Sequence, residues 1–160
     1  MKDCCWIVLI LFLCILIILA TANIALAQGE PSVTTNAATN VTTDSATLNG
    51  NLDSLGTASS VLVSFEWGLT TGYGNETTPG NFTATGPFSD NLSGLSPGTT
   101  YHFRAKAVGD GTSYGQDGNF TTGTTPPSVT TNAATNVTID SATLNGNLDS
   151  LGTASSVLVS

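Results

Sequence analysis

Residues 92–108 read LSGLSPGTTYHFRAKAV. From Tyr101 to Ala107 every second residue is apolar, and the residues between them are polar or charged. Such alternation is typical of a β-strand that buries one face. The Pro97-Gly98 pair before it is typical of a turn. This stretch therefore predicts a tight turn followed by a half-buried strand over 100–108.

The same alternation recurs along the chain. The further strands that it predicts are 45–53, 61–67, 89–93 and 118–122, with shorter extended pieces around Val33, Val41 and Tyr73. Glycine and proline separate these segments, and no helical period is found after residue 27. About seven short strands, each with one apolar face, predict an all-β, two-sheet sandwich over 31–122. Most of its core is expected to come from Val61, Val63, Phe65, Trp67, Leu92, Leu95, Tyr101, Phe103 and Phe120.

The chain contains an internal repeat. Residues 127–160 reproduce residues 31–64 with one change, Thr43 becoming Ile139. The copies begin one small domain apart, which is the spacing of tandem domains rather than of solenoid units. We therefore expect a domain at 31–122, a linker at 123–127 and an incomplete second copy at 127–160. Because the second copy stops within an alternating segment, we expect the sequence to be a fragment of a longer protein.

The incomplete copy has enough residues for about three strands, too few to enclose a core. Its unpaired strand edges predict that it is disordered or that it pairs with other chains. The linker includes Pro126 and Pro127, which favour an extended, semi-rigid connection between the copies. Successive domains would then lie in a row.

Residues 1–27 have the pattern of an export signal. A short polar start precedes an apolar run from Cys4 to Ala20. Ala25 and Ala27 are small residues at the two positions that a signal peptidase reads, so we expect cleavage after Ala27. The alternative is an uncleaved membrane anchor, because the apolar run is near the lower length limit for crossing a bilayer.

The rest of the chain has no cysteine and few charges. All three cysteines lie in residues 1–27, so the domain must be stabilised by its core without disulfides. Arg104 and Lys106 are the only basic residues after the leader, apart from one histidine, and the formal net charge of the chain is −8. This balance argues against nucleic acid and anionic lipid surfaces as partners.

The stretch from Leu92 to Ala107 resembles the fibronectin type III signature before and along the sixth strand of that immunoglobulin-like fold. In that family the pattern Leu-x-Pro-Gly-Thr-x-Tyr turns the chain between the sheets, and the tyrosine hydroxyl bonds back to nearby backbone. The resemblance implies such a tyrosine corner at Leu95, Pro97 and Tyr101. The family's usual second-strand tryptophan is absent here, and Trp67 is expected to fill the core instead.

The sequence has no motif of an enzyme. No Gly-x-Ser-x-Gly elbow, phosphate loop or dinucleotide fingerprint occurs. His102 is the only histidine, its position in the alternation places it on an outer face, and no second His or Cys accompanies it to hold zinc. Asp110 and Asp117 each precede a glycine; oxygen ligands there could suggest calcium, but Asp-Gly pairs are more often turns. We therefore expect no catalysis, no cofactor and no metal.

Two further sets of residues are candidate sites. Glu66, Arg104 and Lys106 share one outer face if the third and sixth predicted strands are neighbours. They would form a cross-strand ion pair or, in a functional interpretation, a binding patch for an acidic glycan or a protein partner. Six Asn-x-Ser/Thr sequences are candidates for N-glycosylation. Their asparagines are Asn40, Asn75, Asn81, Asn91, Asn119 and Asn136.

These observations predict an extracellular or cell-surface protein. Its domains would act as non-catalytic structural or adhesive spacers, whose partners are other repeats of the same chain, surface proteins or carbohydrate. Nucleic acid is not expected to be a partner. Contact with a membrane is expected only through the N-terminal segment or through an unseen C-terminal anchor. Two alternatives stay open at this point: an accessory linker or binding module of an exported polysaccharide-degrading enzyme, and a receptor ectodomain.

Overall fold

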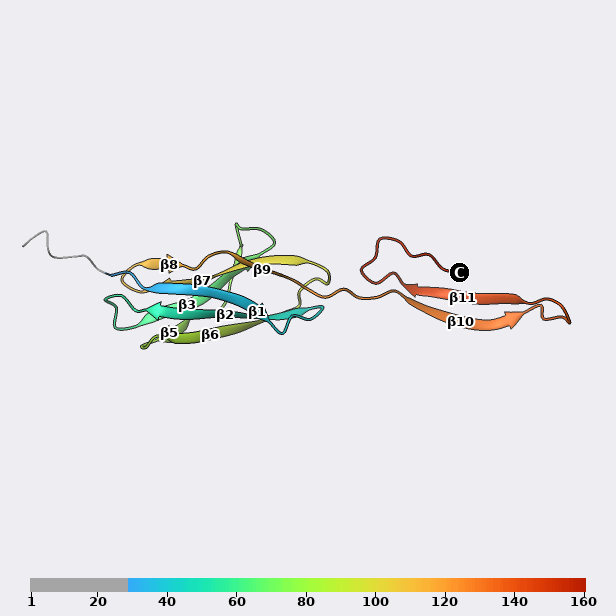
Figure 1. Ribbon diagram of the computed structural model, residues 1–160, viewed down its shortest axis with the longest axis horizontal. Coiled ribbons are helices and arrows are strands. Elements are labelled where there is room, and N and C mark those ends of the chain that lie inside the picture. Colours follow the sequence, from blue (N-terminus) through green and yellow to red (C-terminus); the bar gives the residue numbers. More distant parts are fainter. Residues whose placement is uncertain (1–28) are drawn as a thin grey trace, which may run out of the picture.

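The computed structural model describes residues 29–160, which form β-strands joined by turns and loops and contain no helix (Figure 1). The predicted all-β class is confirmed for this part of the chain. Among residues 29–160 there is no helix long and apolar enough to cross a membrane. The predicted leader at 1–27 and its cleavage site lie outside the described residues.

Nine of the described strands belong to the first copy and two to the second. The strands of the first copy are β1 (Ser32–Thr39), β2 (Ser45–Ser54), β3 (Val61–Gly68), β4 (Asn75–Glu76), β5 (Gly80–Phe82), β6 (Gly86–Ser93), β7 (Thr100–Val108), β8 (Thr112–Tyr114) and β9 (Gly118–Thr121). The strands of the second copy are β10 (Ser128–Thr135) and β11 (Thr143–Ser150).

The strands of the first copy form two antiparallel sheets. In the first sheet, β2 lies between β1 and β6. In the second, β3 pairs with β7, while β4 and β5 pair with β3, and β8 and β9 pair with β7. β1 contacts β7, β8 and β9, and β2 contacts β7, so the two sheets are stacked as a sandwich (Figure 1).

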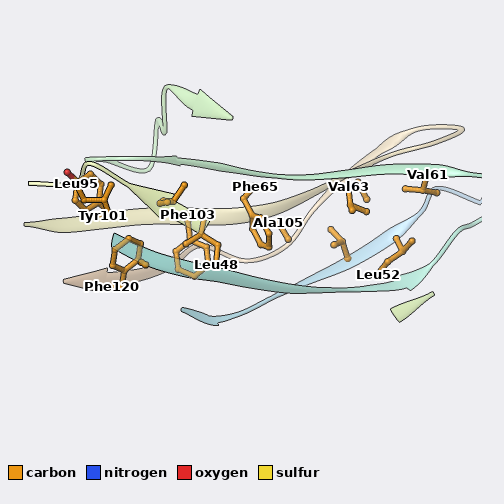
Figure 2. Packing of buried hydrophobic residues seen from close by; sticks show 14 residues of the cluster. Leu48, Leu52, Val61, Val63, Phe65, Leu95, Tyr101, Phe103, Ala105 and Phe120 are labelled. Carbon is orange, nitrogen blue, oxygen red and sulfur yellow. The ribbon is translucent and has the colours of Figure 1, made fainter. Parts of the chain in front are cut away.

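The core lies between the two sheets (Figure 2). The burial patterns of β2 and β7 alternate, so each strand turns one face to this core. Burying one large apolar side chain contributes roughly 1.5–3 kcal/mol before entropy is subtracted. Eight of the nine predicted core residues are buried, and Trp67 is partly buried and packs against the cluster. Ala46, Leu48, Leu52, Ala105 and Ala107 are also buried, on the strand faces that the alternation makes apolar, and so is Val33.

Phe88 of β6 fills a space that a glycine of β2 leaves open. Gly50 and Phe88 lie directly opposite each other in the β2–β6 pair. A Cβ atom on Gly50 would lie 2.8 Å from the Phe88 ring. The ring packs on Phe65, with centroids 4.9 Å apart. The missing side chain at Gly50 therefore allows an aromatic ring to lie across β2.

Two of the short extended pieces predicted from the sequence are not strands. Val41 is exposed and follows Asn40, whose φ of 50° lies in the left-handed region. Tyr73 has a φ of 54° in a turn closed by the hydrogen bond from its amide to the Thr70 carbonyl, at 2.9 Å. Left-handed backbone does not continue a strand. Both predictions were wrong, and the short strand near Tyr73 is β4.

The alternation that places Val63 and Phe65 in the core predicts that Ser64 faces outward from β3, but Ser64 is buried, with 2% of its surface exposed. β4 and β5 both pair with β3, and the Ser64 hydroxyl donates a hydrogen bond of 2.7 Å to Glu76 Oε1. A hydroxyl that is bonded to a carboxylate is satisfied without water. The alternation of residues within β3 could not show that β4 and β5, two short strands later in the chain, would cover Ser64.

The second copy forms a hairpin of two strands rather than the expected three. β10 and β11 pair with the same register as β1 and β2. Residues 157–160, which correspond to the start of β3, are not in a strand. Much of the apolar face of the hairpin is exposed: Leu144 is 86% exposed, whereas Leu48, its counterpart in the first copy, is 0% exposed.

The chain enters and leaves the sandwich at opposite ends. Pro31 lies beside Gly109, next to the turn between β7 and β8. At the other end, the Gly123 amide donates a hydrogen bond of 2.8 Å to the carbonyl of Thr42, which lies in the turn between β1 and β2. The linker leads from there to β10 (Figure 1).

Candidate functional site

The outer face of β3 and β7 carries the charged cluster predicted from the sequence. Glu66 and Arg104 are directly opposite in the β3–β7 pair. Arg104 Nε and Nη2 both donate to Glu66 Oε2, at 2.9 and 2.8 Å. Lys106 Nζ lies 2.9 Å from Glu76 Oε2 and 3.4 Å from Glu66 Oε1. Both basic side chains of the sandwich are therefore paired with carboxylates.

Glu76 belongs to this cluster, although sequence reasoning missed it. Hydrogen bonds from Lys106 and then Ser64 hold the pKa of the Glu76 carboxyl below its usual value of 4.5. The bond to Glu76 raises the pKa of Lys106 above its usual 10.5. Only the two-residue strand β4 brings Glu76 to this face, and a strand that short leaves no period in the sequence.

Two tyrosines enclose the guanidinium of Arg104. Its central carbon lies 3.8 Å from the ring centroid of Tyr114 and 4.7 Å from that of Tyr73. Tyr114 is in β8, beside β7, and Tyr73 is in the turn after β3. A cation over an aromatic face contributes about 0.5–1 kcal/mol at exposed sites. Neither tyrosine was predicted to belong to the site.

Asp117 connects Tyr73 to His102. The Tyr73 hydroxyl donates to Asp117 Oδ1 at 3.0 Å, and Asp117 Oδ2 lies 2.9 Å from His102 Nδ1. Burial, followed by the bond to Asp117, raises the pKa of Tyr73 above its usual 10.0. The three side chains tether the turn at 69–74 to β7. His102 thus lies on the outer face, as its place in the alternation predicts, but within a network.

Gly68 allows this turn to fold back over the sheet. A Cβ atom at Gly68 would overlap the carbonyl of Tyr73. Only glycine fits so close to another backbone segment. The glycine at the end of β3 is therefore the local sequence feature that places Tyr73 above Arg104.

A shallow polar hollow of about 500 Å³ lies between the turn, β4 and Arg104. Its wall has two carboxylates, those of Glu66 and Glu76, and one positive group, the guanidinium of Arg104. An acidic glycan would have to displace these carboxylates from the two basic side chains. The local field therefore gives no preference for an anion.

The residues of the predicted tyrosine corner meet at the turn before β7. The Tyr101 hydroxyl accepts a hydrogen bond of 3.0 Å from the Ser96 amide, which is a bond of the kind that a tyrosine corner makes. Leu95 is buried beneath it. After Pro97, the turn passes through Gly98, whose φ of 62° is one that glycine adopts without strain.

The remaining candidates lie apart from the charged cluster, except Asn75, which is in the wall of the hollow. Asp110 accepts a hydrogen bond of 2.7 Å from the Thr57 hydroxyl, whereas Asp117 is bonded to Tyr73 and lies beside His102. In the part of the chain that the structure describes, no three His, Cys, Asp or Glu side chains are grouped to hold a metal ion. The asparagines of all six glycosylation sequences are exposed: Asn40, Asn75, Asn81, Asn91, Asn119 and Asn136.

No family model matches this chain, and no curated protein matches it. Among solved structures, the sensor domain of the anti-sigma factor RsgI4 of Pseudobacteroides cellulosolvens is 17% identical, with a TM-score of 0.48, over 58% of this chain and 94% of that one. A computationally redesigned β-sandwich is 28% identical, with a TM-score of 0.40, over 58% of this chain and 93% of its own. PhoD is 18% identical, with a TM-score of 0.42, and 21% of its chain is covered. Because these TM-scores are all below 0.5, the all-β fold class is based on the strand pairing within this chain and not on its likeness to these structures.

Proposed function

We propose that this chain belongs to an exported, non-catalytic surface protein in which sandwiches of the fibronectin type III kind act as structural or adhesive spacers. The observation that carries the proposal is that the chain enters the sandwich beside Gly109 and leaves it beside Thr42, at opposite ends. A domain with this geometry adds length every time it is repeated. The repeat of residues 31–64 at 127–160 is what such an array requires.

The assignment to the fibronectin type III kind is supported by two features of the sandwich. The sheet β1-β2-β6 faces a sheet centred on β3 and β7, which resembles the division of strands in immunoglobulin-like sandwiches. The hydrogen bond between Tyr101 and Ser96 lies where the resemblance places a tyrosine corner. The apolar run in residues 1–27 supports export.

The charged cluster supports a structural role for the face that carries it. Arg104 is bonded to Glu66 and stacked between two tyrosines, and Lys106 is bonded to Glu76. These contacts join β3, β4, β7 and β8 and the turn at 69–74 across one sheet. A partner that used these side chains would first have to break contacts within the domain.

The expected length per repeat follows from the strands. β2 has ten residues and spans about 30 Å. The proline-containing linker adds roughly 10–15 Å at the rise of an extended chain. Each repeat should therefore lengthen the molecule by roughly 40 Å.

Small-angle X-ray scattering on chains with one, two and three complete copies of residues 31–126 tests the spacer function. We expect the maximum dimension to grow by roughly 40 Å with each added copy. A matched chain in which Pro126 of each linker is replaced by glycine should show a broader distance distribution at nearly the same mass. Growth well below 20 Å per copy, as for domains folded side by side, would contradict the proposal.

A further inference from the structure

The chain leaves the first copy through residues that are bonded to two of its turns. Thr122 is buried, and its hydroxyl donates a hydrogen bond of 2.7 Å to the Ser96 carbonyl. At Gly123 the amide donates to the Thr42 carbonyl at 2.8 Å, and the carbonyl accepts from the Gly98 amide at 2.9 Å. Because these bonds lead to two different turns, they fix both the position and the direction of the backbone at Gly123.

Two residues later the chain is bonded to the second copy. The Thr125 carbonyl accepts a hydrogen bond of 2.8 Å from the Thr153 amide, in the turn after β11. A Cβ atom at Gly152 would overlap this carbonyl, so the close approach requires glycine. Thr124 is the one residue that separates the two anchored residues.

The first copy has the same bond at its own entrance. Its Thr57 amide donates to the Gly29 carbonyl at 2.9 Å, and a Cβ atom at Gly56 would overlap that carbonyl too. Thr57 and Gly29 are one repeat length before Thr153 and Thr125. The bond therefore belongs to the closed sandwich as well, and the second copy makes it with a threonine where the first has a glycine.

Turns of the two copies meet at Thr124. A Cβ atom on Gly98 would lie 3.5 Å from Thr124 Cγ2 and 3.8 Å from the Cβ and Cγ2 atoms of Thr153. A single methyl group at Gly98 would thus be in van der Waals contact with both threonines. The turn after β11 is at the end of the second hairpin that faces the first copy (Figure 1). The turn before β7 and the turn after β11 therefore lie on either side of the linker residue.

We propose that these two turns form a fixed joint, so that each is an interaction surface for the neighbouring copy of the same domain. The partner belongs to the same chain, which gives it a high effective concentration at the joint and makes a small contact sufficient. The linker predicted at 123–127 is reduced to Thr124 between two anchored carbonyls. The proposal rests on the spacer function and adds that the copies keep one orientation instead of swinging about a free linker.

Double electron–electron resonance across the joint measures how fixed it is. The first copy encloses its core with its own residues, so the test chain is residues 29–160 followed by residues 65–122, which completes the second copy in the same way. Nitroxide labels are attached at Ser93→Cys in the first copy and Asn132→Cys in the second, two exposed positions in a chain without other cysteines. The matched chain has two glycines inserted after Thr124.

We expect a distance distribution in the unaltered joint that is clearly narrower than in the chain with the inserted glycines. Equal widths in the two chains would overturn the proposal. The spacer function is judged separately, because an array with flexible joints still lengthens with each copy. Growth of about 40 Å per copy in scattering, together with equal widths, would reject the joint and leave the spacer function standing.

Thr153→Gly tests the contact between the turns. It removes the side chain that lies beside Gly98 and keeps the amide that bonds to Thr125. The matched variant Thr57→Gly removes the same side chain at the entrance of the first copy, where it bonds to Asp110 of its own copy. We expect Thr153→Gly to broaden the distribution and Thr57→Gly to leave it unchanged, with cooperative melts in both. Equal distributions in the two variants would show that the turns do not hold each other and would overturn the proposal.

Discussion

Gly50 and Gly146 are the same residue of the repeat in two different surroundings. In the first copy a Cβ atom at Gly50 would lie 2.8 Å from the Phe88 ring. In the second copy the nearest atom to a Cβ at Gly146 is the Thr130 carbonyl oxygen, at 3.3 Å, and no aromatic ring is near. A single residue can thus be essential for packing in one copy and replaceable in the other.

Gly50→Ala is therefore expected to destabilise the sandwich by about 1–3 kcal/mol, the range for overfilling a packed core. The extra methyl group would push the Phe88 ring away from Phe65. The matched variant Gly146→Ala should leave the melt unchanged. Urea unfolding monitored by the fluorescence of Trp67 measures both; equal effects of the two substitutions would mean that Phe88 does not pack across β2.

At the scale of the elements, the second sheet is held by side chains on its outer face as well as by the core. Glu76 of β4 bonds to Lys106 of β7 and to Ser64 of β3. These bonds lower the pKa of Glu76. A group whose pKa is lower in the folded state stabilises the fold above its unfolded pKa, and that contribution is lost as the pH falls through the folded pKa.

Glu76→Gln should therefore cost about 0.5 kcal/mol at pH 7, a value typical of a solvent-exposed ion pair. The difference from the unaltered chain should shrink as the pH falls below 4.5, the usual pKa of the carboxyl. Lys106→Gln removes the main cause of the shift and should give the same flattening. Unfolding free energies measured at pH 7 and pH 3 decide this, and a difference that grows toward pH 3 would contradict it.

At the scale of the whole molecule, two near-identical hairpins differ in what covers them. β1–β2 is part of a closed sandwich, whereas β10–β11 pairs with no other strand of residues 29–160. Segments with few buried contacts open locally at a small cost in free energy. The same sequence should therefore have two different stabilities within one chain.

Limited proteolysis of the exported chain at low concentration compares the two hairpins directly. We expect a nonspecific protease to remove residues 127–160 before it cuts within 31–64. Mass spectrometry can assign the released peptides, because Ile139 marks one copy and Thr43 the other. Cleavage of both hairpins at the same rate would show that the sandwich does not protect β1–β2.

The alternation of apolar residues determined the longer strands and the side of each that carries the large side chains of the core. This held for Tyr101, Phe103 and Phe120 because a strand's side chains alternate whatever it pairs with. It also predicted that Glu66 and Arg104 would share one face once their strands were neighbours. The copied register of β10–β11 follows from the repeat itself.

The tertiary structure alone decided how segments without a period are placed. The pairing of β3 with β7 brings together the left-handed turn at Tyr73, the two-residue strand that holds Glu76 and the loop that holds Asp117. The tertiary structure also decided burial. Ser64 is buried where β4 and β5 pair with β3, and Leu144 is exposed because no second sheet packs on its hairpin. A local pattern fixes the direction of a side chain, but distant segments determine whether that side meets protein or water.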